Sequence, residues 1–155
     1  MKNKNGFSLV EILIAIGVIG LLLSLWALSL YSQKKEIRDL KRLSDINAIE
    51  NALKVVKNDT GTYETALCLP TSVSLCALDS SSALLKYLPD LGQMNDPSNP
   101  SKFCTLATCS DKCNYAFASL RQDDYEILFY LEKGSDKFAQ KGCYVATSAG
   151  ISFVK

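Results

Sequence analysis

The sequence predicts an α+β fold in which one long N-terminal helix packs on a small antiparallel β-sheet. From Phe7 to Tyr31 the chain is apolar apart from a few serines and glycines and one acid, Glu11. Strong helix formers without proline continue this segment to about Lys57. Further on, residues 114–120 and 125–132 alternate or are rich in β-forming side chains, which is typical of strands. One long helix followed by a run of short strands indicates the α+β class.

The apolar run is long enough to span a membrane. Its 25 residues would form a helix of roughly 37 Å, against a hydrocarbon core of about 30 Å. A secretory signal peptide would be shorter and end in a small-residue cleavage site. The leading Lys2 and Lys4 place the N-terminus in the cytoplasm by the positive-inside rule. Opposing this orientation, five cations follow the run: Lys34, Lys35, Arg38, Lys41 and Arg42.

Glu11 is the residue that a plain membrane anchor does not explain. A carboxylate inside a span costs free energy and needs a positive partner. Lys2 and Lys4 can supply one by reaching toward it along the helix. The alternative is a positive group on a neighbouring subunit.

The segment "GFSLVEILIAI" resembles the class III prepilin signal of the type IV pilin and pseudopilin family. The resemblance implies that a prepilin peptidase cuts the chain after Gly6 and methylates the new N-terminus at Phe7. It also implies that Glu11 is the acid that pairs with the Phe7 ammonium of a neighbouring copy during filament assembly. Residues 1–6 would then be a cleaved leader, and residues 7–31 the transmembrane and later filament-core half of the helix.

The apolar side chains of this half would supply most of the attraction between packed helices, among them Ile12, Ile16, Ile19 and Leu23. Gly17 and Gly20 favour either close helix packing or flexibility, and both interpretations stay open. Many pilins carry a proline in the region that corresponds to residues 25–28 here. This chain has none there, so the resemblance does not predict that its helix melts on assembly.

Residues 32–58 are predicted to be the amphipathic half of the same helix. Ile46, Ile49, Leu53 and Val56 recur at helical spacing and need a cover. The helix should stop at "NDTG", and the following turn resembles that of the family, with Glu64 in place of a proline.

Residues 59–155 are predicted to form a globular extracytoplasmic head. Segment 81–92 predicts a short helix with Leu84, Leu85 and Leu88 inward, and segment 93–102 a loop. Strands at 114–120 and 125–132 flank a tight turn, and one or two further strands end the chain.

All six cysteines follow residue 67. In a head outside the membrane they are interpreted as disulfides, although the sequence does not fix their pairing. Cys68 and Cys76 make the easiest local pair. The other four would make two bridges that tie the loop before the sheet to its last strand: Cys104, Cys109, Cys113 and Cys143. A redox or metal role for Cys104, Cys109 and Cys113 is the less favoured alternative.

Other candidate chemistry is sparse. Asp90, Asn95 and Asp96 are weak calcium candidates because they fall short of the oxygen ligands that calcium needs, and a solvated turn is the simpler interpretation. Asp123, Asp124 and Glu126 are interpreted as turn residues rather than a catalytic pair. The chain has no histidine, which excludes histidine triads and histidine metal sites. A net charge of +1 does not indicate a nucleic-acid partner.

The expected function is that of a structural subunit of a type IV pilus or pilin-like filament, without enzymatic activity or cofactor. The alternative is a pseudopilin of a type II secretion or DNA-uptake (competence) system. A membrane-anchored extracellular thiol protein or enzyme is less favoured. The expected partners are the membrane, further copies of the chain, prepilin peptidase and the assembly machinery. The chain is expected in the inner or cytoplasmic membrane with its head outside, and later in an extracellular or periplasmic filament.

Overall fold

The structure is a computed structural model of the 155-residue chain. It describes residues 8–66, 68, 72–98, 101–109, 112–134, 138 and 140–155, without the side chains of residues 27–29. The chain divides into two compact units, Met1–Lys35 and Glu36–Lys155, and each is described by itself.

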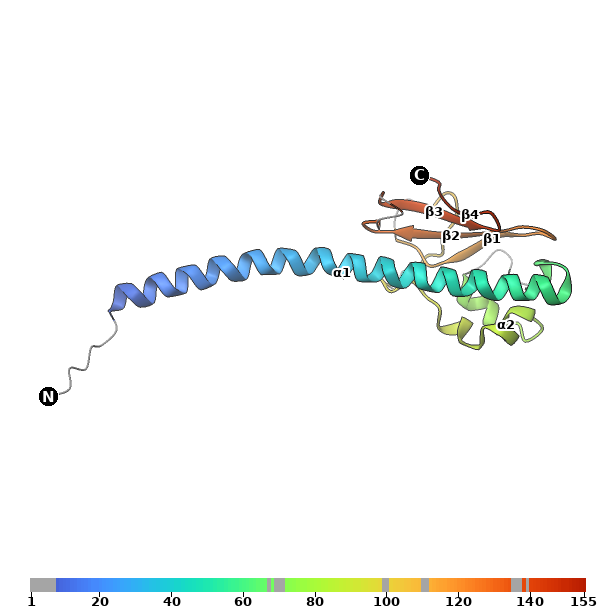
Figure 1. Cartoon of the computed structure of the whole chain (residues 1–155), viewed down its shortest axis with the longest axis horizontal. Helices are drawn as coiled ribbons and strands as arrows, with labels where there is room; N and C mark the ends of the chain where they lie inside the picture. The colour runs from blue at the N-terminus through green and yellow to red at the C-terminus, as the bar shows by residue number, and fades with distance from the viewer. Residues whose placement is uncertain are drawn as a thin grey trace. The chain divides into compact units, whose positions relative to one another are not determined.

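Helix α1 runs from Leu9 to Thr60 (Figure 1). It has no proline, and its end is defined by Gly61, whose positive φ of 79° suits the residue that follows a helix. The Gly61 N–H still donates to the Lys57 carbonyl at 2.9 Å. The helix therefore ends slightly later than the stop at about Lys57 that the sequence predicts.

The second unit contains a four-stranded antiparallel sheet in the order β1-β2-β3-β4. The strands are β1 (Ala116–Leu120), β2 (Tyr125–Leu131), β3 (Gly142–Thr147) and β4 (Gly150–Phe153). The predicted tight turn joins β1 to β2, with Leu120 opposite Tyr125. The C-terminal segment forms two strands, and the predicted α+β class is confirmed.

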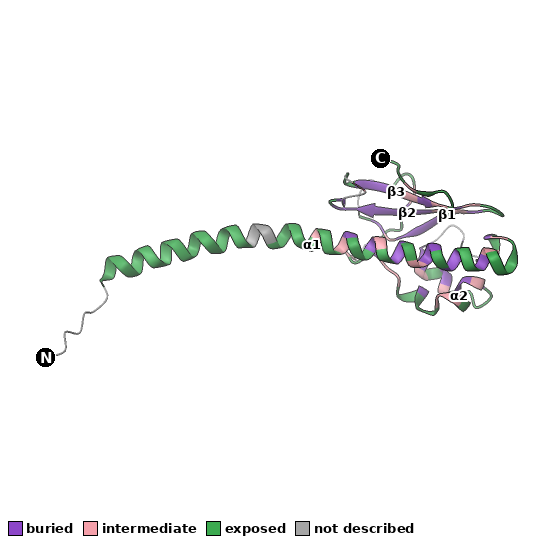
Figure 2. Cartoon of the chain, viewed as in Figure 1, coloured by how far each residue is buried: buried purple, intermediate pink, exposed green. Residues whose placement is uncertain are grey.

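The main core lies between the second half of α1 and one face of the sheet. The predicted helix stripe is fully buried, as Figure 2 shows by the buried residues along this part of α1. It shares one cluster with Tyr115, Phe117, Tyr125, Ile127 and Phe129. Because strand residues alternate between faces, Leu128 and Tyr130 point the other way, into a smaller cluster that contains four cysteines.

In the described part of the connection between α1 and the sheet lie four short helices: η1 (Glu64–Ala66), η2 (Val73–Leu78), α2 (Ala83–Tyr87) and η3 (Pro89–Gln93). Helix α2 confirms the predicted amphipathic segment, because Leu84 is buried while Leu85 and Leu88 pack partly against the core. The start of η2 is held on the sheet by a hydrogen bond from the Val73 N–H to the Tyr115 carbonyl at 2.9 Å.

Candidate functional site

The first unit presents an apolar surface that no described residue of the unit covers. Every described side chain from Ser8 to Trp26 and from Leu30 to Lys34 is exposed, as the first half of α1 in Figure 2 shows. Ile12, Ile16, Ile19 and Leu23 are 50–66% exposed. The helix is long and apolar enough to cross a membrane. A continuous apolar surface of this length is unfavourable in water, so it requires lipid or other apolar helices around it.

Glu11 lies in the first turn of α1, where the positive end of the helix dipole favours an acid. The N–H groups of Glu11 and Ile12 donate to the Ser8 carbonyl at 3.0 and 3.2 Å. Among the described residues, the Glu11 carboxylate has no hydrogen-bond or ion-pair partner. Gly6 and Phe7, the predicted cleavage and methylation positions, lie outside the described residues.

Gly17 and Gly20 lie within the exposed helix. A Cβ atom at either position would meet nothing within 4 Å, so the described residues offer no steric reason for glycine there. Small residues on a membrane helix allow another helix to approach closely. Open space around both glycines fits the packing interpretation.

Aromatic and basic residues mark the far end of the apolar surface. Trp26 and Tyr31 are each 65% exposed, and the Lys35 ammonium lies 4.4 Å from the centre of the Tyr31 ring. Tryptophan, tyrosine and lysine are the residues that gather where a membrane meets water.

A buried ion-pair network follows in the second unit, centred on Arg42. The Arg42 side chain is 0% exposed. Its Nη1 donates to Asp39 Oδ1 at 2.6 Å, and its Nε and Nη2 donate to the two Asp96 oxygens at 2.6 and 2.8 Å. Its Nη2 also donates to Glu132 Oε1 at 2.9 Å. Although burial lowers the pKa of Arg42, hydrogen bonds and charges from these carboxylates raise it overall.

The network joins α1 to the end of β2. Arg38 donates two hydrogen bonds of 2.7 Å to the Glu132 carboxylate. Burial alone would raise the pKa of Glu132, but hydrogen bonds from Arg38 and Arg42 outweigh it and lower the pKa to about 2. Asp39 accepts hydrogen bonds from the N–H groups of residues 132–134 at 2.8–3.1 Å. The sequence did not predict this cluster. Its only trace in the local sequence is an acid and a base three residues apart on one helix, Asp39 and Arg42.

Three of the five cations after the apolar run form ion pairs in or beside this network. Arg38, Lys41 and Arg42 each contact a carboxylate, from Glu132, Asp45 and Asp39 among others. Lys34 and Lys35 lie in the first unit. Most of the positive charge that opposed the predicted orientation is therefore balanced within the folded head.

Two of the three calcium candidates have protein groups as hydrogen-bond partners. Asp96 is 2% exposed, and both of its carboxylate oxygens accept hydrogen bonds from Arg42. The Asn95 Oδ1 accepts from Asn114 Nδ2 at 2.7 Å, and Asp90 is exposed on η3. The interpretation of Asp96 as a solvated turn residue is wrong, because its partner is a cation from α1 that the loop sequence does not reveal.

The acids of the β1–β2 turn have structural partners. Asp124 accepts hydrogen bonds from the Ser148 N–H at 3.0 Å and from its hydroxyl at 2.7 Å, which ties this turn to the β3–β4 turn. These hydrogen bonds lower the pKa of Asp124. Asp123 forms an ion pair with Lys57 near the end of α1. Both aspartates act as turn residues, in line with the prediction.

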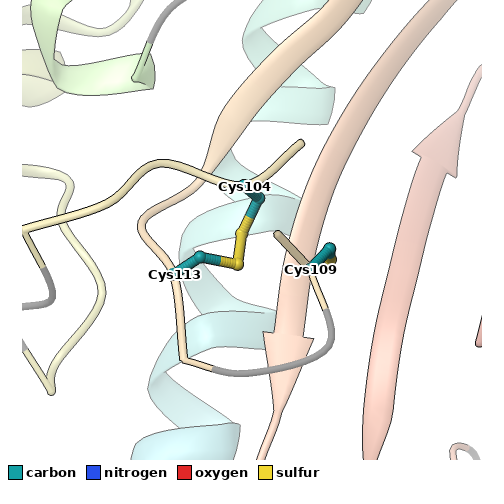
Figure 3. A group of neighbouring side chains, drawn as sticks. All are labelled: Cys104, Cys109 and Cys113. Atoms are coloured by element: carbon teal, nitrogen blue, oxygen red, sulfur yellow. A yellow bond between two sulfur atoms is a disulfide. The ribbon is translucent and has the colours of Figure 1, made fainter. Parts of the chain in front are cut away.

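Two disulfides connect four of the cysteines, Cys104 to Cys113 and Cys109 to Cys143. Figure 3 shows the first bridge, with Cys109 beside it. The Sγ atoms of Cys104, Cys109 and Cys113 lie within 4.8 Å of one another. Each sulfur is already bonded to another sulfur, so this group offers no thiolate to a metal.

Two details of the cysteine prediction differ from the structure. Cys143 lies on β3, whereas the last strand is β4. Cys68 and Cys76, the expected local pair, are buried free thiols in this structure.

Comparison with known proteins identifies the N-terminal segment. Residues 1–27 match the family model described as the prokaryotic N-terminal methylation motif. The chain is 36% identical over 94 residues to the type II secretion system core protein G of Escherichia coli (strain K12). This aligned region covers 56% of this chain and 65% of that protein. It is 38% identical over 64 residues to the protein of the same name from Aeromonas hydrophila, covering 41% of this chain and 45% of that protein.

A third relative, the type II secretion system core protein G of Vibrio cholerae, is 34% identical over 65 residues, or 42% of this chain and 44% of that protein. The matches thus span about half the length of these relatives, and up to 65% in the case of Escherichia coli. No solved structure matches the chain.

Proposed function

Because the chain belongs to the type IV pilin-like family of proteins with an N-terminal methylation motif, we propose that it is a pseudopilin, a filament subunit of a type II secretion system. The observation that carries the proposal is the exposed apolar half of α1, most of which lies within that motif. The relatives favour this function over the type IV pilus subunit that the sequence places first, because those named above are type II secretion proteins. The proposal assigns no catalytic activity to the chain.

The first step of the proposal is processing at the Gly6–Phe7 bond. Hydrolysis by a prepilin peptidase adds water across this peptide bond, which leaves a carboxylate on Gly6 and an amine on Phe7. Methylation keeps that amine basic, so it carries a positive charge at neutral pH. The apolar half of α1 holds the chain in the membrane before and after this step.

The second step is lateral packing of the processed helices. Each new copy brings a Glu11 carboxylate that lacks a partner among the described residues, and each copy already in place brings a Phe7 ammonium. A charge buried alone in apolar surroundings is strongly unfavourable, so the two are best buried together. The pair fixes the axial register, while the exposed isoleucines and leucines supply the area of contact.

The proposed topology puts the head outside the cytoplasm. Two disulfides stabilise the head, and disulfides persist in oxidising compartments. The balance of Arg38, Lys41 and Arg42 by head carboxylates leaves fewer uncompensated cations after the span. Lys2 and Lys4 then govern the orientation with the N-terminus inside.

Intact-mass measurement of the membrane-extracted chain tests the processing step. Cells with prepilin peptidase should yield a chain that begins at Phe7 and carries one added methyl group, and cells without the enzyme a chain that retains Met1–Gly6. Gly6→Leu should block cleavage, whereas the neighbouring Asn5→Ala should not. A chain that keeps its first six residues in the presence of the peptidase would contradict the proposal.

Glu11→Gln tests the assembly step, because glutamine keeps the size of the side chain and removes its charge. We expect normal processing, but loss of most of the processed chain from filaments collected by shearing and sedimentation. Ser24→Ala, on the same exposed helix surface, is the matched control and should assemble normally. Normal filaments of the Glu11→Gln variant would disprove the charge-pair account.

Deletion of the gene in its host separates the two filament types. A type II secretion pseudopilin predicts that secreted proteins accumulate within the cell envelope while surface pili still form. Loss of surface pili with normal protein secretion would instead identify a pilus subunit.

A further inference from the structure

Cys68 and Cys76 lie next to each other in the main core of the head. Their exposed fractions are 1% and 3%, and both belong to the cluster that covers the apolar stripe of α1. The Cys76 thiol lies close enough to Cys68 to raise the pKa of the Cys68 thiol. Cys68 Sγ also donates to the Ala66 carbonyl at 2.9 Å. Two neighbouring cysteines that are buried in the same cluster need little backbone movement to be joined.

The surroundings of the pair argue against catalysis by the folded thiols. The neighbouring Cys76 thiol and burial raise the pKa of the Cys68 thiol, and the nearby Asp79 carboxylate acts in the same direction. The chain has no histidine that could activate a thiol. Since the thiolate is the reactive form, the packed dithiol is inert toward oxidants and electrophiles.

We propose that Cys68 and Cys76 form a third disulfide in the exported protein, closed by thiol–disulfide exchange before this segment packs on the core. The inference does not depend on the proposed secretion role; it requires only that the head matures where its other two disulfides are formed.

The reaction balances with a disulfide donor of the kind that closes those two bridges. One cysteine thiolate attacks the donor disulfide, forms a mixed disulfide and releases one donor thiolate. The second cysteine thiolate then attacks the protein sulfur of the mixed disulfide, which forms the Sγ–Sγ bond and releases the other donor thiolate. The two cysteine protons end on the donor thiols, and the donor is reduced by two electrons.

The bridge would secure the segment that covers the outer edge of β1. Between the two cysteines, Ser72 forms an isolated bridge with Ala116, and the Val73 N–H donates to the Tyr115 carbonyl at 2.9 Å. An uncovered sheet edge is a template for pairing with another chain. A short covalent loop around residues 72 and 73 would keep this edge covered when the head fluctuates.

Peptide mapping tests the bridge directly, because the sequence separates it from the other two. Trypsin cuts after lysine and arginine, so Cys68 and Cys76 fall in one peptide, residues 58–86. The other four cysteines fall in three peptides, residues 103–112, 113–121 and 142–155. Chain extracted from membranes should be alkylated under denaturing conditions before any reductant is added, and then digested.

If the third bridge exists, peptide 58–86 is released on its own, unalkylated and about 2 Da lighter than its dithiol form. It then accepts two alkyl groups after reduction. Two alkyl groups on this peptide before reduction, or its attachment to another cysteine peptide, would overturn the proposal. The three remaining peptides serve as an internal control, because two bridges should hold them together in every sample.

Cys68→Ser provides the matched control, and hydrogen exchange provides a readout in the folded chain. This variant should show one alkylated thiol, at Cys76, and keep the other two bridges. Exchange at the Val73 amide should be faster in the variant than in the oxidised chain, while exchange at β2 amides should be unchanged. Equal exchange at Val73 in both proteins would disprove the role of the bridge in holding this segment.

Discussion

Arg42 shows how a single residue can hold the head together from inside. Its guanidinium is buried against three carboxylates, from Asp39, Asp96 and Glu132. A planar group with five N–H donors can satisfy several acceptors at once, which a lysine ammonium does less well. The three partners come from α1, the loop before β1 and the end of β2, so one side chain links three separate parts of the fold.

Replacing Arg42 should therefore be far more damaging than replacing an exposed cation. Arg42→Met leaves three buried carboxylates without their shared partner and should lower the free energy of unfolding by about 3–5 kcal/mol. Lys34→Met, at an exposed position just after the apolar run, should change it by less than about 0.5 kcal/mol. Urea unfolding of the detergent-solubilised chain, followed by tyrosine fluorescence of the head, measures both. Similar losses in the two variants would refute a special role for Arg42.

Glu132 gives the head a sensitivity to acid. Its pKa is about 2 in the folded chain, below its ordinary value of 4.5. The stabilisation from its ion pairs is therefore complete above about pH 4.5 and is lost as the pH falls toward 2. We expect the urea midpoint of the wild type to fall through this window. Glu132→Gln should have a lower midpoint at neutral pH and a smaller fall in acid; an unchanged acid dependence would contradict this assignment.

At the scale of the element, α1 carries two apolar surfaces with different partners. The described side chains of its first half, up to Lys34, are all exposed, whereas its second half buries a stripe against the sheet. Both surfaces were predictable from the sequence, because one is a continuous apolar run and the other a helical repeat. The buried stripe also explains why the polar positions of the second half do not interrupt the helix.

Two leucines on the second half of α1 provide a matched comparison. Leu53 is 0% exposed, whereas Leu40 is 56% exposed. Leu53→Ala removes the same atoms as Leu40→Ala but leaves a cavity, so it should cost about 2–5 kcal/mol of unfolding free energy. Leu40→Ala should cost less than about 0.5 kcal/mol by the same unfolding measurement. Equal costs would mean that the stripe does not form the core in solution.

At the scale of the whole molecule, the disulfides and the helix stabilise opposite faces of one sheet. Helix α1 covers the face that carries Phe117 and Phe129. The four bridged cysteines cluster with Leu128 and Tyr130 on the other face. The loop between η3 and β1 is thereby fixed to the sheet without a second helix layer.

The two bridges should contribute unequally to stability. Cys109 and Cys143 are 34 residues apart, and Cys104 and Cys113 only 9. A longer closed loop restricts the unfolded chain more, so Cys109→Ser with Cys143→Ser should cost about 1 kcal/mol more than Cys104→Ser with Cys113→Ser. Thermal and urea unfolding of the two double variants would check the order, and the reverse order would show that strain or packing outweighs loop length.

The sequence by itself determined the features that depend on neighbouring residues. The apolar run, the stripe of Ile46 to Val56, the strands β1 and β2 and the turn between them follow from local periodicity and turn chemistry. The segment around Gly6 and Glu11 carries the resemblance to the pilin-like family. Processing at Gly6 and the pairing of Glu11 stay predictions of that local pattern.

Only the tertiary structure decided which distant groups meet. Asp96 lies 54 residues after its partner Arg42, and Glu132 lies 90 residues after it. The sequence has no periodicity that links such positions. Opposite charges can form an ion pair whatever their separation along the chain. The same holds for the cysteines, because six of them allow many pairings. The fold selected Cys109 with Cys143 by bringing a loop against β3, and it buried Asp96 where the loop sequence alone indicated a solvated turn.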